Sequence, residues 1–318
     1  MVESPGVDGE PAGAGGAAVK RRPRTGRLGS GFTGWAFVLP TILVLLALTI
    51  FPLIFSLALS FSNVSQDNGL TFTDRTLDNW RQLLHNGDYW QSLIYTTEFV
   101  VLAVIIEFLI GFGLALLLWR RIRFGGFFRV LFSIPMMLAP VAIGFMWRML
   151  YDQTNGPIDA ILGGLHLGSV PWLAESRSAF LAVLIMDVWE WTPFMFLLLL
   201  AGLQSLSEEA LEAAQLDGAT GMRVIWDIIF PMLAPISVMA VFLRFTESFT
   251  IFGQIIQLTG GGPGTATTST TLYAYFQGYQ DFNVSSGATI ALSLLVFVTV
   301  IALCYLAITR RLLLRFEE

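Results

Sequence analysis

Six apolar runs, each long enough to cross a bilayer, constrain this chain more than any other feature. A hydrocarbon core about 30 Å thick needs roughly 20 apolar helical residues to span it. Backbone groups cannot stay unpaired in lipid, and the runs lack the alternation of β-strands, so we expect helices. The runs extend approximately over Trp35–Phe61, Ser92–Trp119, Phe127–Leu150, Ala179–Leu203, Leu233–Leu258 and Ala288–Thr309. The sequence therefore predicts an all-α, polytopic membrane protein with six transmembrane helices.

The cationic residues predict an orientation for these helices. Only 13% of the 318 residues are charged, and thirteen of the eighteen Lys and Arg residues fall on one side of the predicted spans. Positively charged flanks are retained in the cytoplasm, so we expect both termini to be cytoplasmic. These thirteen residues are Lys20, Arg21, Arg22, Arg24, Arg27, Arg120, Arg121, Arg123, Arg129, Arg223, Arg310, Arg311 and Arg315.

The first 30 residues differ in composition from the rest of the chain. They are rich in Gly, Ala and Arg and have no apolar periodicity, so we expect a disordered basic tail over residues 1–30. Residues 31–318 then form one transmembrane domain, with a cytoplasmic loop at about residues 204–231.

Several kinds of chemistry are excluded by residues that the chain lacks. Its single Lys, Lys20, is followed by Arg21 in the tail, so no phosphate-binding P-loop can form. The two histidines, His85 and His166, belong to no zinc-ligand pattern, and no Gly-x-Ser-x-Gly elbow is present. We therefore expect no nucleotide, metal or other cofactor bound by this chain, no catalytic residues and no nucleic-acid partner.

Charged residues inside the apolar runs are candidates for function, because a charge in hydrocarbon is costly and usually faces a bundle interior or an aqueous path. Asp187, Trp189, Glu190 and Trp191 lie near the middle of one run, where rings can stack on a sugar and carboxylates can accept its hydroxyl protons. With Glu247 they form our candidate substrate pathway. The complete set of intramembrane charges is Glu98, Glu107, Arg148, Asp187, Glu190, Arg244 and Glu247.

Each of these residues also has a purely structural interpretation. Pro193 could kink the helix while Thr192 restores its backbone bonding, and the carboxylates could pair with other helices. Arg244 and Glu247 are three residues apart on one helix face, which favours a local ion pair. Carboxylates outnumber arginines among the intramembrane charges, so a neutral sugar or polyol is favoured over a phosphate ester.

The loop at residues 204–231 is polar in an otherwise apolar chain. Ser205 and Glu208 have capping-box spacing, and Gly218 suits the left-handed conformation that ends a helix. A second short helix should follow and end or kink at Pro231, with an apolar stripe of Met222, Ile225, Trp226 and Ile229. Segments that lie on lipid headgroups favour Lys and Arg, whereas this loop is mainly acidic. We therefore expect it to bind a protein partner.

The stretch "EAAQLDGATGMRVIWDIIFPMLAP" resembles the EAA loop in permease subunits of binding-protein-dependent ABC importers. The flanking segments "WEWTPFMFLLLLAGLQSL" and "LTGGGP" resemble the sugar-transporting branch of that family, of the maltose or glycerol-phosphate permease type. The positions that match the coupling motif are Glu212, Ala213, Ala214, Asp217, Gly218 and Ala219.

The resemblance implies a set of partners and a location. The loop would dock on a separate ATP-binding subunit, present in two copies, that carries ATP and Mg. A second permease subunit would complete the helix bundle, and an extracytoplasmic sugar-binding protein would deliver substrate at a bacterial inner membrane. The mechanism would be alternating access. The rival hypothesis is an ion-coupled secondary transporter that uses Asp187, Glu190 and Glu247, and an intramembrane hydrolase is a third, although no nucleophile motif supports it.

Overall fold

A computed structural model of the chain describes residues 30–65, 75–119, 125–207, 209, 216, 217 and 221–314. Two compact units, Met1–Pro52 and Leu53–Glu318, divide the chain and are treated separately. Within the described ranges every regular element is a helix, and five helices are long and apolar enough to cross a membrane. The predicted all-α membrane fold is therefore confirmed, whereas the predicted number of six spanning helices is not.

The first unit contains most of helix α1 (Ser30–Ser60), which continues past the unit boundary. Its spanning part, Val38–Ser60, has a mean hydropathy of 2.8, and side chains such as Leu48 are exposed. Pro40 and Pro52 both lie inside the helix. An apolar surface of this kind is stable only against lipid or another apolar protein surface.

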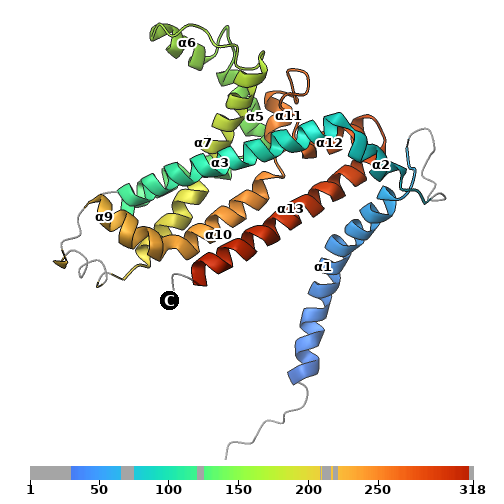
Figure 1. The fold of residues 1–318 in the computed structure, drawn as a ribbon, viewed down its shortest axis with the longest axis horizontal. Coiled ribbons are helices and arrows are strands. Elements are labelled where there is room, and N and C mark those ends of the chain that lie inside the picture. Colours follow the sequence, from blue (N-terminus) through green and yellow to red (C-terminus); the bar gives the residue numbers. More distant parts are fainter. Residues whose placement is uncertain are drawn as a thin grey trace, which may run out of the picture. The chain divides into compact units, whose positions relative to one another are not determined.

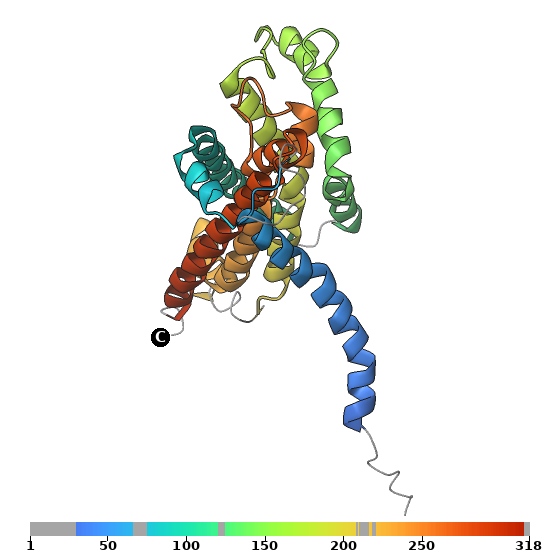
Figure 2. The same ribbon diagram turned by 90° about the vertical axis from the view of Figure 1, so that its right-hand side faces the viewer.

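Four long helices form the bundle of the second unit (Figures 1 and 2). They are α3 (Gly87–Trp119), α7 (Ser176–Gln204), α10 (Phe230–Ser248) and α13 (Val284–Leu314). The pairing of α3 with α7 is the most extensive, and α10 contacts all three of the others. Gly111 permits the close approach of α3 to α7, because a Cβ there would lie 2.8 Å from Met195 Cβ.

The third predicted span, Phe127–Leu150, is not one helix. It is divided into α4 (Gly125–Ser133), η1 (Pro135–Met137) and α5 (Pro140–Leu150). Proline has no backbone N–H to donate and clashes with the preceding turn, so Pro135 and Pro140 each begin a new element. Hydropathy alone does not register these breaks, which is why the run was expected to be continuous.

The fifth predicted span, Leu233–Leu258, is wrong at both ends. The helical path begins with α9 (Met222–Val224), continues through the π-helical turn η2 (Ile225–Ile229) and runs without a break into α10. After Ser248 the chain bends before the short helix α11 (Gly253–Leu258). Side chains at the start of a later helix bond to the carbonyls of the bend: the Thr271 hydroxyl donates to Phe249 O at 3.1 Å, and the Ser269 hydroxyl donates to Ile251 O at 2.9 Å.

The apolar stripe expected after the acidic loop also differs from the structure. Ile229 is buried, but Met222 and Trp226 are 64% and 55% exposed. Trp226 and Ile229 lie within η2, whose wider turn changes the angular spacing of side chains from that of a regular α-helix. Ile229 is part of a buried apolar cluster that includes Phe196 and Leu233, and Ile225 and Ile228 pack against this cluster.

The remaining described elements are short. They are α2 (Asp78–His85), α6 (Pro157–Gly164), α12 (Thr270–Tyr275) and the π-helical turn η3 (Phe276–Gln280). The glycine-rich segment before α12 is fastened by buried hydroxyl groups: the Thr268 hydroxyl donates to Gly261 O at 3.1 Å, and Thr96 accepts from Thr270 N at 2.9 Å. The start of α12 is therefore packed against α3, and the glycine-rich segment is closed by its own hydrogen bond.

Candidate functional site

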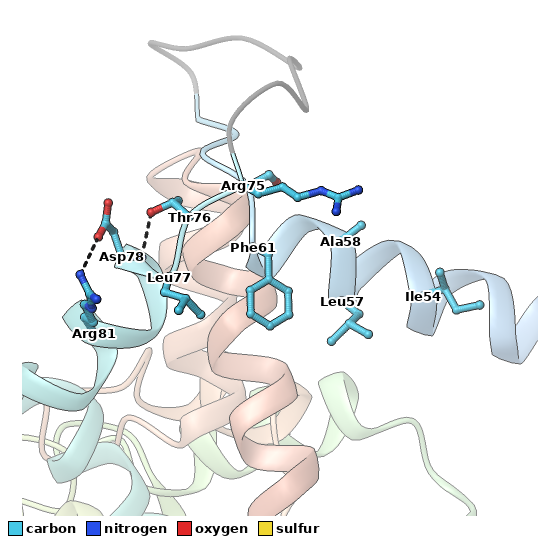
Figure 3. A pocket seen from close by; sticks show the side chains of 10 residues that line it. Ile54, Leu57, Ala58, Phe61, Arg75, Thr76, Leu77, Asp78 and Arg81 are labelled. Carbon is cyan, nitrogen blue, oxygen red and sulfur yellow. Dashed lines mark hydrogen bonds and ion pairs between the residues drawn. The ribbon is translucent and has the colours of Figure 1, made fainter.

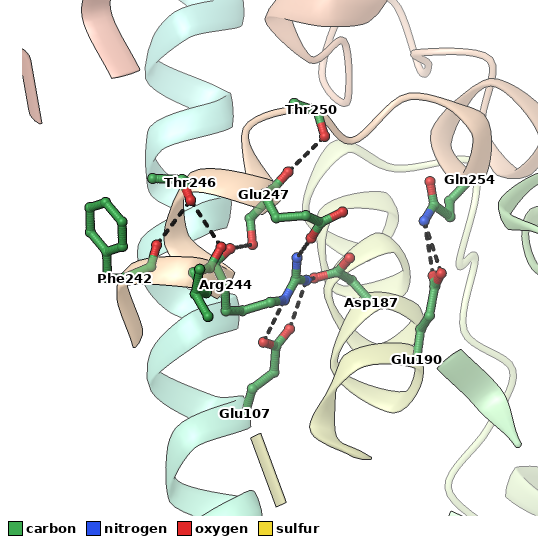
Figure 4. Close-up of polar contacts among 11 residues, drawn as sticks. Glu107, Asp187, Glu190, Phe242, Arg244, Thr246, Glu247, Thr250 and Gln254 are labelled. Atoms are coloured by element: carbon green, nitrogen blue, oxygen red, sulfur yellow. Dashed lines mark hydrogen bonds and ion pairs between the residues drawn. The ribbon is translucent and has the colours of Figure 1, made fainter. Parts of the chain in front are cut away.

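Arg244 on α10 is the centre of a buried ion cluster that joins three helices (Figure 4). Its Nε donates to Glu107 Oε2 at 2.8 Å and its Nη2 donates to Glu107 Oε1 at 3.0 Å, so the contact with α3 is bidentate. Nη2 also donates to Asp187 Oδ2 on α7 at 2.5 Å, and Nη1 donates to Glu247 one turn further along α10. The local ion pair of Arg244 and Glu247 is thus present, but it is one part of a larger cluster.

The cluster carries more negative than positive groups. Glu107, Asp187 and Arg244 are almost completely buried, at 0%, 1% and 1% exposure. Three carboxylates share one guanidinium, whose carbon also lies 4.6 Å from the centre of the Trp191 ring. A buried charge without a partner is strongly unfavourable, so each member depends on the others.

A cavity of about 340 Å³ opens beside this cluster. Its wall includes Asp187, Trp191, Arg244, Glu247 and Gln254. The side chain of Glu247 is 47% exposed, in contrast to the two buried carboxylates. The cavity therefore presents a carboxylate and an aromatic ring together, which are groups that bind hydroxylated ligands.

The other two candidate pathway residues lie away from this cavity or behind its wall. Glu190 is buried and accepts two hydrogen bonds from Gln254 Nε2, at 3.2 and 3.0 Å, so it positions a residue of the wall. Trp189 is 37% exposed and packs edge-on against Trp147, with 5.7 Å between ring centres, in a separate apolar cavity. The structure thus brings together Asp187, Trp191 and Glu247 and leaves Trp189 elsewhere. The roles of all five remain predictions.

The middle of α7 continues through Pro193 without ending. The Thr192 hydroxyl donates to Val188 O at 2.6 Å, one residue before the carbonyl that Pro193 cannot bond. Thr192 thus makes a local helix contact but does not satisfy the carbonyl that Pro193 leaves free, while Asp187 and Glu190 reach the cluster and the cavity wall.

Three residues of this site are not among the predicted pathway residues. Glu107 and Arg244 are charged residues in apolar runs, and that position is the signal that could have selected them. Gln254 carried no such signal, because it contacts Glu190 across 64 positions of sequence. Within the described ranges, no group of three His, Cys, Asp or Glu residues is placed to hold a metal ion.

A larger cavity, of about 740 Å³, lies elsewhere in the second unit (Figure 3). Apolar side chains including Leu57 and Phe61 line it, together with Arg75, Asp78 and Arg81. Asp78 and Arg81 are exposed and 3.8 Å apart. It contains none of the predicted pathway residues, so size alone does not locate the candidate site.

Most of the predicted coupling loop falls outside the described residues. Glu212, Ala213, Ala214, Gly218 and Ala219 are not described, and Asp217 is exposed in a turn. The expected helix-turn-helix and its role therefore stay predictions.

The fold and the site define a multi-pass helical membrane protein with a polar cavity at a buried ion cluster. A family model described as "Binding-protein-dependent transport system inner membrane component" matches residues 107–315, and the chain belongs to this family. The resemblance inferred from the coupling motif is thereby confirmed.

Relatives extend the match over most of the chain. A probable ABC transporter permease protein of Sinorhizobium fredii is 35% identical over 91% of this chain and 92% of its own length. The trehalose/maltose transport system permease protein MalF of Thermococcus litoralis is 34% identical over 87% of this chain and 93% of its own length. A crystal structure of a bacterial ABC transporter that imports alginate has the same fold, with a TM-score of 0.78, 21% identity and coverage of 88% and 95%.

Proposed function

We propose that this chain is the membrane-spanning subunit of an ATP-driven sugar importer and forms half of its translocation pathway. The observation that carries the proposal is the close match in length and sequence to permeases such as the trehalose/maltose protein. As a transport subunit the chain is not an enzyme, and it performs no chemistry on its substrate.

The cavity beside Arg244 is the proposed substrate contact. Glu247 can accept hydrogen bonds from sugar hydroxyl groups, and the partly exposed Trp191 ring offers an apolar face for the C–H side of a sugar. The acid-rich cluster disfavours an anionic ligand, because a phosphate or carboxylate would approach two buried acids and a third at the surface. A neutral sugar or polyol is therefore the proposed substrate class.

Energy would come from another protein. The sequence motif from Glu212 to Ala219 would dock on a separate ATPase subunit, two copies of which bind ATP and Mg. A second permease would supply the other half of the pathway, and an extracytoplasmic binding protein would deliver the sugar. Closure of the ATPase dimer would then switch the helices between two access states in a bacterial inner membrane, with both termini of this chain in the cytoplasm.

The test is uptake by reconstituted vesicles. The chain, its second permease and the ATPase subunits are placed in liposomes, and uptake of radiolabelled neutral disaccharides is measured with the binding protein outside and ATP inside. We expect uptake that requires ATP and the binding protein. Uptake driven by a proton or sodium gradient in vesicles containing this chain alone would contradict the proposal and support a secondary transporter.

A further inference from the structure

A second cavity, of about 530 Å³, lies where helices α3 and α7 both begin. It is lined by Tyr95 and Glu98 from α3 and by Ser176 and Arg177 from α7. Gln91, in the second turn of α3, and Ser176, the first residue of α7, both line this cavity, so α3 and α7 start at the same end of the bundle. The cavity is separate from the one beside Arg244.

The two charged groups of this cavity have no protein partner among the described residues, whereas Gln91 in the same lining accepts a hydrogen bond from Thr265 at 3.4 Å. Glu98 and Arg177 are both exposed, and neither makes a hydrogen bond or an ion pair with the described part of the chain. Tyr95 is only 6% exposed, yet its buried hydroxyl has no hydrogen-bond partner among the described residues. The two exposed charged side chains are therefore available to a ligand that carries complementary charges.

An apolar cavity of about 830 Å³ lies further along the same two helices and is also lined by residues of α4, η1 and α5, among them Leu131, Pro135 and Trp147. Leu181 lines both cavities, and the apolar one follows α7 from Leu181 to Phe196 and α3 from Ile106 to Leu114. At about 1.5 Å per residue, Leu181 and Phe196 are about 22 Å apart along the helix, which exceeds one leaflet of a hydrocarbon core about 30 Å thick. No charged residue lines this apolar part.

We propose that the α3–α7 groove binds a phospholipid with a zwitterionic, primary-amine headgroup, of the phosphatidylethanolamine class. Arg177 would pair with the phosphate and Glu98 with the ammonium group, because guanidinium matches phosphate geometry and a carboxylate attracts a cation. The acyl chains would fill the apolar part beyond Leu181. The order of the groups along the groove, with opposite charges at one end and no charged side chain beyond, matches this amphiphile better than a peptide helix or a sugar.

The test is lipid binding by the full chain, purified in detergent with the subunits that co-purify with it and then stripped of lipid. Phosphatidylethanolamine, phosphatidylglycerol and diacylglycerol with identical acyl chains are added, and retained lipid is measured by native mass spectrometry. We expect saturable, preferential retention of phosphatidylethanolamine. Equal retention of all three would overturn the proposal, since it indicates a non-specific lipid shell.

Variants locate the binding to the groove. Arg177→Gln and Glu98→Gln should each weaken phosphatidylethanolamine binding about tenfold, the loss expected for one charge-assisted hydrogen bond. Ile185→Trp, which fills the apolar part, should abolish it. Matched controls outside the groove are Arg75→Gln and Leu295→Trp, at exposed positions of the same residue classes. Unchanged binding in the groove variants contradicts the proposal.

A photo-crosslinking residue with a small aliphatic diazirine side chain, which does not fill the cavity as Trp would, is placed at position 185 to separate lipid from protein occupancy. Since Ile185 is 42% exposed, the substitution should leave folding intact, which the melting temperature of the purified complex checks. A phospholipid adduct supports the proposal. An adduct with another polypeptide overturns it, because the groove would then be a helix-docking surface.

Discussion

Arg244 on α10 donates to both carboxylate oxygens of Glu107 on α3, at 2.8 and 3.0 Å, across 137 positions of sequence. Neither side chain is more than 1% exposed, so the pair lies wholly within the protein. A bidentate contact of this kind fixes both the distance and the orientation of the two helices. Loss of either partner should therefore destabilise the packing of α3 against α10.

Arg244→Met should destabilise the protein by about 3–5 kcal/mol, because Glu107 and Asp187 would remain buried without a cation. The melting temperature in detergent measures the loss. The control is Arg81→Met, at an exposed arginine 3.8 Å from Asp78, which should cost less than about 1 kcal/mol. Adding Glu107→Gln to Arg244→Met should restore part of the stability; no restoration would show that lost packing, and not unpaired charge, causes the effect.

Gly111→Ala should destabilise the protein by about 1–3 kcal/mol, because overpacking forces helices apart. The new Cβ would lie 2.8 Å from Met195 Cβ and 2.9 Å from Phe196 N. The control in the same helix is Gly113→Ala, because no atom lies within 4 Å of a Cβ added there. Ala has a higher helix propensity than Gly, so this variant should not lower the melting temperature. Equal melting temperatures for both variants would mean that α3 and α7 are not held this closely.

Glu247→Ala should lower sugar uptake about tenfold while stability changes by no more than about 1 kcal/mol. Its side chain is 47% exposed and lines the cavity, so its loss removes a ligand contact without exposing the core. Uptake kinetics and the melting temperature of the same preparation test this. Thr246→Ala on the adjacent, non-lining position is the control. A large fall in melting temperature alongside the fall in uptake would contradict this prediction, because it would show that Glu247 stabilises the fold and need not contact the substrate.

Glu212→Lys should uncouple transport from ATP hydrolysis, because it reverses a charge at the proposed docking surface. Co-purification of the ATPase subunit and ATP-dependent uptake are the two measurements. Glu209→Lys, outside the matching motif, is the comparison that controls for added positive charge. If Glu212→Lys retains both the ATPase and full uptake, the coupling role of this loop is wrong.

The sequence was sufficient to predict the positions of the long apolar helices but not the places where an apolar run is interrupted. Hydropathy located α7 and α13 to within a few residues, since burial in lipid requires long apolar runs. It missed the division at Pro135 and Pro140, because a window average does not register a missing backbone donor. It also placed the fifth span too late, because the apolar residues of α11 continue the run after the chain has bent.

The sequence predicted which residue types form the candidate site, but it did not predict which of these residues contact one another. Intramembrane charge selected Asp187, Glu190 and Glu247, which the structure brings near one cavity or its wall. The Arg244–Asp187 contact spans 57 positions, so no local spacing rule could reveal it. Trp189 shared the same local pattern, yet its place on the helix turns it to the opposite side of α7 from Asp187.

The close fit at Gly111 and the Arg244 cluster together leave the block of α3, α7 and α10 without an internal hinge. Sliding any one of these helices would collide with a neighbouring backbone or strand an acid in an apolar interior. Under the proposed alternating-access mechanism, α3, α7 and α10 would therefore move as one rigid body, and relative motion would be confined to the outer faces of this block.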